Sequence, residues 1–182
     1  MALSAAIFKT NVQLSDMDRQ LYSSYSLTLA RHPSETNERM MARLIAFMRY
    51  ASERLVFTKG LSESDEPDLW AKDLTGQTEL WIEVGAPAVR RIVTKSRQVR
   101  KIVVFGYGRQ ADLWWKKSKA DLEKIGNLEV VILPVQLTES ISSHVKRSMD
   151  WQCLIQDNQM NLIGENDNFY VDFGLCTRLS KK

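Results

Sequence analysis

The chain contains few of the residues that proteins use for cross-links and for tight metal binding. Among its 182 residues there are two cysteines, Cys153 and Cys176, and two histidines, His32 and His144. Two cysteines so far apart form neither a disulfide framework nor a CxxC metal site, so we expect buried thiols. With so few sulfur and imidazole ligands, the sequence does not predict a zinc site.

Long apolar runs are also lacking. No uninterrupted apolar segment approaches the roughly 20 residues of a membrane span, and no basic segment followed by an apolar one begins at Met1. We therefore expect a cytoplasmic protein with no membrane partner. The proportions of apolar residues (44%) and charged residues (26%) are typical of globular proteins, and the length predicts a single domain over residues 1–182.

The net charge of +3 is small, but acids and bases are separated along the chain. Residues 61–83 contain seven acids and the single base Lys72, whereas residues 84–111 contain seven bases and no acid. Solvated surfaces often carry such runs, and this explanation is as good as a functional one. In the functional interpretation, carboxylates that hold a divalent cation are followed directly by cations that hold phosphate.

Hydrophobic periodicity predicts an α/β (α+β) fold. The expected elements are strands at 5–14 and 20–30, a helix from a Ser34 cap to about Glu53, a strand at 54–59, a hairpin at 66–85, a helix from Pro87 to about 98, a strand at 101–107, a helix at 111–125, a strand at 128–133, a helical piece from 138 to about 149, and strands at 151–156, 160–163 and 169–175. This order predicts a mixed sheet between helices, with a core at about 34–134. The segments 5–30 and 151–175 would flank it as an N-terminal hairpin and a C-terminal β-meander.

The hairpin segment EPDLWAKDLTGQTELWIEVG, residues 66–85, is unusually acidic for a half-buried sheet. With its turn at residues 75–76, the expected cross-strand pairs are Lys72 with Glu79, Trp70 with Trp81, and Asp68 with Glu83. The first two pairs stabilise a sheet as an ion pair and an aromatic pair. Carboxylates directly opposite each other repel unless a cation lies between them. Mg²⁺ or Mn²⁺ suits this place, because Mg²⁺ takes one or two carboxylates and keeps water and phosphate as further ligands.

Each of these assignments has a plainer alternative. Thr-Gly is a weak hairpin signal, so the register can differ, or Asp68 and Glu83 can splay into solvent. Glu38 falls on the apolar stripe of the first helix, where a buried carboxylate needs a partner. An acid in the first turn of a helix also interacts favourably with the helix dipole and can remain solvated. Lys95 lies beside the apolar stripe of the next helix, from which its ammonium either reaches the strand ends or is simply solvated.

Four stretches resemble the YaeQ family of small bacterial proteins, and the resemblance covers most of the chain: HPSETNERMMARLIAF, GLSESDEPDLWAKDLTG, LWIEVGAP and DLWWKK. Pro67-Asp68 followed by Glu83-Val84-Gly85 also resembles the PD-(D/E)xK nuclease superfamily. That resemblance implies the restriction-endonuclease-like αβββαβ core, metal ligands at Asp68 and Glu83, and the helical acid at Glu38. The lysine of the superfamily motif is replaced here by Gly85, which offers neither charge nor proton. Lys95 on the following helix is the candidate for its role, and Lys72 on the face of the hairpin is the second candidate.

Two functions fit these residues. The first is a Mg²⁺-dependent nuclease or phosphodiesterase acting on DNA or RNA, in which Asp68 and Glu83 hold the ion, Lys95 orients the nucleophile, and Arg90, Arg91 and Arg97 contact the nucleic-acid backbone. The second is a catalytically silent nucleic-acid-binding or regulatory module that keeps the nuclease scaffold without the motif lysine.

Overall fold

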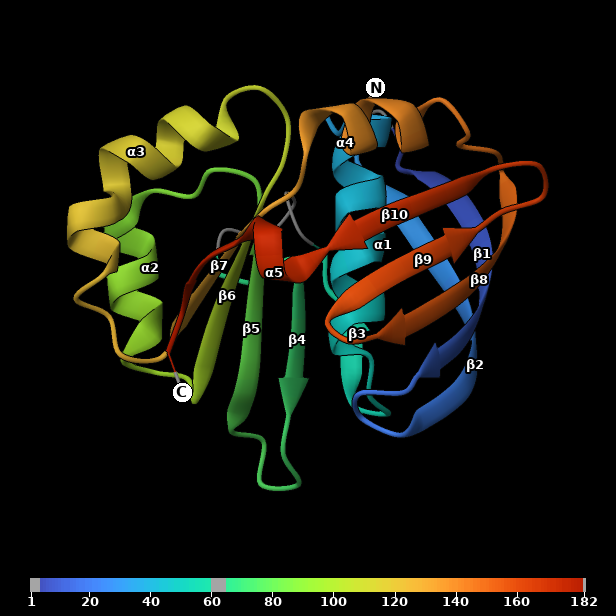
Figure 1. Ribbon diagram of the computed structural model, residues 1–182. Helices are drawn as coiled ribbons and strands as arrows, with labels where there is room; N and C mark the ends of the chain where they lie inside the picture. The colour runs from blue at the N-terminus through green and yellow to red at the C-terminus, as the bar shows by residue number, and fades with distance from the viewer. Residues whose placement is uncertain (1–3, 60–64, 182) are drawn as a thin grey trace.

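Two β-sheets enclose a central helix in the computed structural model, which describes residues 4–59 and 65–181 (Figure 1). The strands are β1 (Ala6–Asp16), β2 (Leu21–Arg31), β3 (Leu55–Phe57), β4 (Leu69–Lys72), β5 (Thr78–Val84), β6 (Lys101–Gly106), β7 (Leu128–Ile132), β8 (Ser148–Gln156), β9 (Gln159–Ile163), β10 (Asn168–Asp172) and β11 (Thr177–Ser180). The helices are α1 (Asn37–Tyr50), α2 (Val89–Ser96), α3 (Ala111–Leu122), α4 (Val135–Ser142) and α5 (Phe173–Cys176).

Both sheets are mixed, which confirms the predicted α/β class. The six-stranded sheet has the order β11-β7-β6-β5-β4-β3, with β5, β6 and β7 parallel and the remaining neighbours antiparallel. The five-stranded sheet has the order β10-β9-β8-β1-β2. The N-terminal hairpin and the C-terminal meander were expected as separate flanks, but they form this one sheet because β1 pairs with β8 in parallel.

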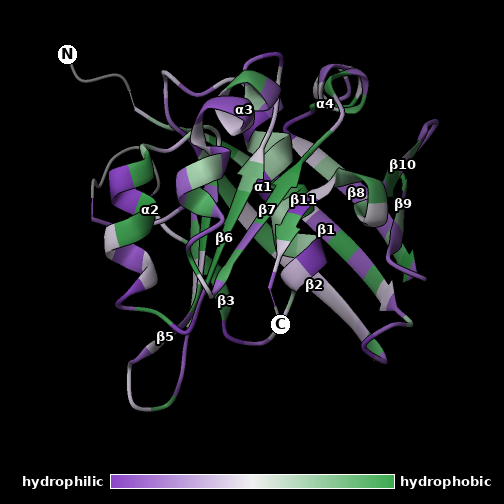
Figure 2. Ribbon diagram, turned by 60° about the vertical axis from the view of Figure 1, so that its left-hand side comes forward, coloured by the Kyte–Doolittle hydropathy of each residue, from purple (hydrophilic) through white to green (hydrophobic). Residues whose placement is uncertain are grey.

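Helix α1 lies between the two sheets, and α2 and α3 cover the opposite face of the six-stranded sheet (Figure 1). The strands of that sheet are apolar on both faces because both are covered. In β6, Val103 and Phe105 belong to the cluster around α1, whereas Ile102 and Val104 belong to the cluster under α2 and α3. Figure 2 shows this strand in the green of hydrophobic residues.

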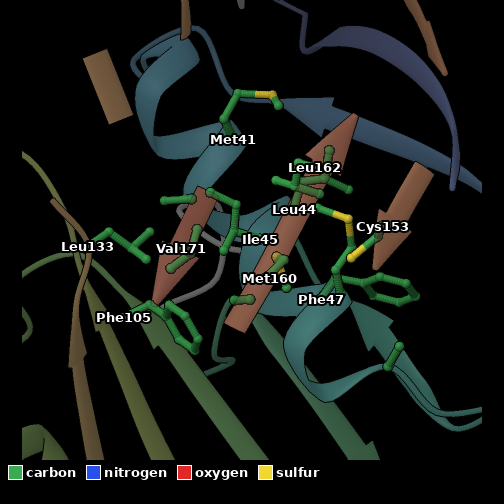
Figure 3. Packing of buried hydrophobic residues seen from close by; sticks show 14 of the residues in the cluster. Met41, Leu44, Ile45, Phe47, Phe105, Leu133, Cys153, Met160, Leu162 and Val171 are labelled. Carbon is green, nitrogen blue, oxygen red and sulfur yellow. The ribbon is translucent and has the colours of Figure 1, made fainter. Parts of the chain in front are cut away.

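The central core is built around α1, whose residues from Met40 to Met48 are all buried. The predicted stripe of the helix (Met41, Leu44, Ile45 and Met48) is confirmed as buried. Figure 3 shows Ile45 and Phe47 of α1 beside Phe105 of the six-stranded sheet and Met160 and Leu162 of the five-stranded sheet. A single hydrophobic core therefore joins both sheets.

Two predicted helix boundaries are wrong. Helix α1 is capped by Thr36, whose hydroxyl accepts a hydrogen bond from the Arg39 amide, and it runs over Asn37–Tyr50 instead of from Ser34 to about Glu53. Helix α4 ends at Ser142 instead of near Met149, because Met149 is a buried residue of β8.

The predicted strand at 169–175 is also wrong in its second half. Strand β10 ends at Asp172, whose carboxylate accepts hydrogen bonds from the amides of Gly174 and Leu175 and so caps the short helix α5. The following strand β11 was not predicted, and it pairs antiparallel with β7. None of the helices within residues 4–59 and 65–181 is long and apolar enough to cross a membrane.

Candidate functional site

The acids singled out in the sequence gather near the carboxyl ends of the parallel strands β5 and β6. Glu83 is the last residue but one of β5, Asp68 directly precedes β4, and Glu38 lies in the first turn of α1. The carboxyl ends of strands in α/β sheets are the usual places for ligands. The charge of Asp68 contributes to the pKa of Glu83, so these two acids are close enough to interact.

The predicted register of the acidic hairpin is confirmed in the middle and wrong near the turn. Trp70 pairs with Trp81, and their rings meet edge to face with centroids 6.2 Å apart. Lys72, however, pairs with Thr78 and not with Glu79, because the register shifts after Ala71. The ammonium of Lys72 lies 3.7 Å from the centre of the Trp70 ring, where it makes a cation–π contact.

Asp68 is buried and its two carboxylate oxygens both accept hydrogen bonds. Oδ1 accepts from Nη2 of Arg39 at 2.6 Å, and Oδ2 accepts from the backbone amide of Val84 at 2.7 Å. The side chain is 3% exposed and that of Arg39 is 11% exposed. This is a buried ion pair that ties the start of β4 to helix α1 and to the end of β5.

Glu83 forms the second ion pair of the site. Its Oε1 accepts hydrogen bonds from Nε of Arg91 at 2.6 Å and from Nε1 of Trp81 at 2.8 Å. Burial raises the pKa of the Glu83 carboxyl, although the bonds from Trp81 and Arg91 oppose this effect. Because the folded-state pKa is raised, the proton-linked contribution of Glu83 to stability is fully present below about pH 4.5 and is lost as the pH rises through the folded-state pKa.

Three residues that were not singled out in the sequence form a charged network at the start of α1: Glu35 before the Thr36 cap, and Arg39 and Arg43 on the helix. Glu35 holds Arg43 through two hydrogen bonds of 2.8 Å, one on each carboxylate oxygen, and also accepts from Nη1 of Arg39 at 2.9 Å. Burial alone lowers the pKa of Arg39, but the carboxylates of Asp68 and Glu35 outweigh this and raise it. The signal for this network was the spacing of Glu35, Arg39 and Arg43 at four-residue intervals, although only Arg39 and Arg43 lie on one face of α1 and Glu35 precedes its cap.

The carboxylate of Glu38 contacts α4. Its Oε1 accepts a hydrogen bond of 2.6 Å from the hydroxyl of Thr138, a buried residue of α4. Gly108, in the loop after β6, lies so close that a Cβ there would be 3.5 Å from the same oxygen. The carboxylate on the apolar stripe therefore does have a partner, as one of the two interpretations expected.

The candidate cations fall into two groups. Arg91 is held by Glu83 and also donates from Nη2 to the backbone oxygen of Glu66 at 2.8 Å. Lys95 places its ammonium 4.9 Å from the centre of the Trp81 ring. Arg90 and Arg97 are exposed on the outer side of α2. The structure thus brings Arg91 and Lys95 to the tryptophan–carboxylate side of the sheet and leaves Arg90 and Arg97 toward solvent.

Gly85, at the position of the motif lysine, has a backbone φ of +121°. Side chains other than glycine rarely adopt this conformation, so a lysine here would be strained. The amide of Gly85 donates to the backbone oxygen of Phe105, which fixes the turn against β6. The local backbone therefore explains why the chain carries glycine at this place.

The arrangement does not fit a Mg²⁺ site. A hard divalent cation needs carboxylate oxygens that are free to coordinate it. Both oxygens of Asp68 already accept hydrogen bonds, one from Arg39 and one from the Val84 amide. One oxygen of Glu83 accepts hydrogen bonds from both Arg91 and Trp81. Across residues 4–59 and 65–181, no three His, Cys, Asp or Glu side chains converge to hold a metal ion. Glu63, one of the seven acids of the charge run, lies outside these residues. Binding of Mg²⁺ or Mn²⁺ stays a prediction, and the ion pairs do not support it.

The fold and site define a class: a mixed α/β protein with one core between two sheets and a carboxylate pair neutralised by arginines. The chain belongs to the YaeQ family, because the sequence profile described as "YaeQ protein" matches residues 1–173. The protein named "Uncharacterized protein YaeQ" of Escherichia coli (strain K12) is 41% identical over 173 residues, which is 94% of this chain and 96% of that protein. The protein of the same name in Salmonella typhi is 41% identical over 172 residues, 94% of this chain and 95% of that protein.

Two crystal structures of YaeQ proteins have a similar fold. The YaeQ protein of Xanthomonas axonopodis pv. citri superposes with a TM-score of 0.92 at 40% identity, covering 97% of this chain and 99% of that chain. The YaeQ protein of Pseudomonas syringae has a TM-score of 0.92 at 30% identity, covering 97% of both chains. The predicted family is therefore confirmed, and the relationship to the nuclease superfamily stays a prediction.

Proposed function

We propose that the protein is a nucleic-acid-binding module that holds the DNA or RNA backbone without metal-dependent catalysis. The observation that carries this proposal is that each acid at the expected metal-ligand positions makes a 2.6 Å ion pair with an arginine, Asp68 with Arg39 and Glu83 with Arg91. An internal cation takes the place of a metal at each carboxylate. The remaining bases of the neighbouring helices are then the groups that meet phosphate.

The segment that contains α2 and α3 is basic. The two helices contain six Lys and Arg residues against two Asp residues, a difference of +4. The whole segment 89–127, which also includes β6, contains eleven Lys and Arg residues against three Asp and Glu residues, a difference of +8, although the net charge of the whole chain is only +3. The rest of the chain is consequently acidic by 5. A basic surface of this kind on one side of a protein attracts a polyanion and orients its approach.

The cations best placed for phosphate contacts lie on the exposed faces of the two helices. Arg90, Thr94 and Arg97 form an exposed stripe along α2, and Lys116 and Lys117 are exposed on α3. Within the described ranges, Arg90, Arg97, Lys116 and Lys117 make no ion pair. These four side chains are therefore available to phosphate without the cost of breaking an internal pair.

Such contacts provide affinity without sequence readout, because phosphate oxygens are the same at every nucleotide. Binding of this kind weakens steeply with salt, since each neutralised phosphate releases counterions. We assign no side chain to base recognition.

Replacing Arg90 and Arg97 together by glutamine is expected to weaken binding of duplex DNA and to reduce the slope of log K against log salt by about 2, at about 0.9 per lost phosphate contact. Fluorescence anisotropy of a labelled duplex, recorded over a salt series in EDTA, measures both quantities. The matched control is Lys9→Gln with Lys146→Gln, which removes the same charge from the exposed side of the five-stranded sheet and its adjoining loop.

The proposal holds if the α2 variant loses affinity, the control does not, and the DNA stays intact with Mg²⁺ or Mn²⁺. Equal losses in both variants would show that only net charge matters and that α2 is not the interface. Cleavage that requires a divalent ion and disappears in Glu83→Gln would replace the proposal by the nuclease function.

A further inference from the structure

We propose that two copies of this chain associate by antiparallel pairing of their β2 strands, which joins the two five-stranded sheets into one continuous sheet. The inference is independent of nucleic-acid binding, because β2 contributes none of the four cations that are assigned to phosphate contacts. It rests on the chemistry of the sheet edge.

Strand β2 forms one edge of the five-stranded sheet, and among the described strands it pairs only with β1. It is 11 residues long, and it is fully paired with β1 from Leu21 to Arg31. The ten residues before Arg31, LYSSYSLTLA, include no charged residue, no proline and no glycine. Natural proteins usually protect an exposed edge with such residues or keep it short, because its free backbone groups pair readily with another strand.

The other described edges carry these protections. Strand β3 has only three residues, and β10 has five and ends in Asp172. Strand β11 has four residues, including Arg178, and is followed by Lys181. Among the edges of the two sheets within residues 4–59 and 65–181, β2 is therefore the long one, and its only charged residue is Arg31 at its end.

The side chains of β2 differ between its two faces. Leu21, Tyr25 and Leu27 point toward the core but remain only half-buried, whereas Tyr22, Ser24 and other polar residues point outward and are exposed. Figure 2 shows much of the strand in pale colours. The edge thus leaves apolar surface that a neighbouring strand would cover.

A second copy of the chain fits this edge better than an unrelated strand because β2 is complementary to itself. A two-fold axis perpendicular to the sheet pairs β2 with its copy in antiparallel direction and keeps the inner faces on the same side. The half-buried Leu21, Tyr25 and Leu27 of one copy then lie beside those of the other, and the serines and threonine meet on the outer face. No like charges face each other over residues 21–29. The backbone oxygen of Ala30 already accepts a hydrogen bond of 3.1 Å from Nη2 of Arg43, so the pairing extends over residues 22–28.

The test introduces charge on the outer face of the edge. Ser24→Lys with Ser26→Lys places four ammonium groups around the two-fold axis, and we expect the dissociation constant of the dimer to rise at least about tenfold. The matched control is Gln13→Lys with Asn11→Lys on β1, since Ser24 pairs with Gln13 and Ser26 with Asn11 on the same outer face. Both variants disturb the hydrogen bond between Ser26 and Asn11. The control also removes the hydrogen bond of 2.8 Å from Asn11 to Asp150, so any additional loss within the monomer falls on the control.

Sedimentation equilibrium over a range of protein concentrations measures the association, and circular dichroism checks that each variant is folded. The proposal predicts a wild-type dimer, a control that still dimerises, and a β2 variant that is folded and monomeric at concentrations where the wild type is dimeric. A wild type that stays monomeric throughout, or equal weakening in both variants, would overturn it. So would open-ended aggregation of the wild type, because two-fold pairing closes at two copies.

Discussion

Replacing Asp68 by alanine is expected to lower the free energy of unfolding by about 3–5 kcal/mol, because the substitution breaks a buried ion pair and a buried hydrogen bond together. Arg39 then keeps its ion pair with Glu35, which it shares with Arg43, and the buried amide of Val84 loses its acceptor. Chemical denaturation of the wild type and the variant in the absence of divalent ions measures the difference.

A double-mutant cycle with Arg39→Ala separates the pair from its surroundings. If Asp68 and Arg39 act on each other, the double variant loses clearly less stability than the sum of the two single variants. Glu139→Ala is the control, because it breaks an exposed pair with Arg109 and should cost no more than about 1 kcal/mol. A loss for Asp68→Ala as small as that of the control would show that the carboxylate is not a structural partner of Arg39.

Replacing Phe105 by alanine is expected to cost about 3–5 kcal/mol, the usual range for truncating a fully buried phenylalanine. Phe105 is 0% exposed in β6 and its ring meets those of Tyr50 in α1 and Phe173 in α5 edge to face. Figure 3 shows it beside Leu133 and Val171, in the part of the core that the two sheets share. Thermal and chemical unfolding measure the loss, which we expect in a single transition because the core is continuous.

Tyr170→Ala provides the comparison on an exposed aromatic ring, since Tyr170 is 49% exposed. A surface change of this kind should alter stability by no more than about 0.5 kcal/mol. Two separate transitions in the Phe105 variant, or a loss as small as that of Tyr170→Ala, would contradict the packing of both sheets on one core.

Much of the fold could be predicted from the sequence because its signals are local. The stripe of α1 follows from the spacing of apolar residues, and the Trp70–Trp81 pair follows from the symmetry of a hairpin. The parallel pairing of β1 with β8 could not be predicted, because it joins residues more than a hundred positions apart and leaves no periodic trace in either strand. Strand β11 was missed because four residues are too few for a pattern.

The candidate site could likewise be predicted from the sequence only in part. Asp68 and Glu83 could be singled out because like charges facing each other across a hairpin require an explanation. The explanation itself could not be predicted, because Arg39 lies 29 positions from Asp68 and an arginine on a helix is usually solvated. The sequence predicted that Arg91 contacts phosphate. In the structure its guanidinium instead forms an ion pair with the carboxylate of Glu83.

Titration of the wild-type protein with Mn²⁺, followed by isothermal titration calorimetry, tests the central claim most directly: Asp68 and Glu83 are held by arginines and not by a metal. We predict no one-to-one site tighter than about 1 mM, and the same result for Glu83→Gln. A single Mn²⁺ bound per chain in the wild type and lost in Glu83→Gln would contradict the account.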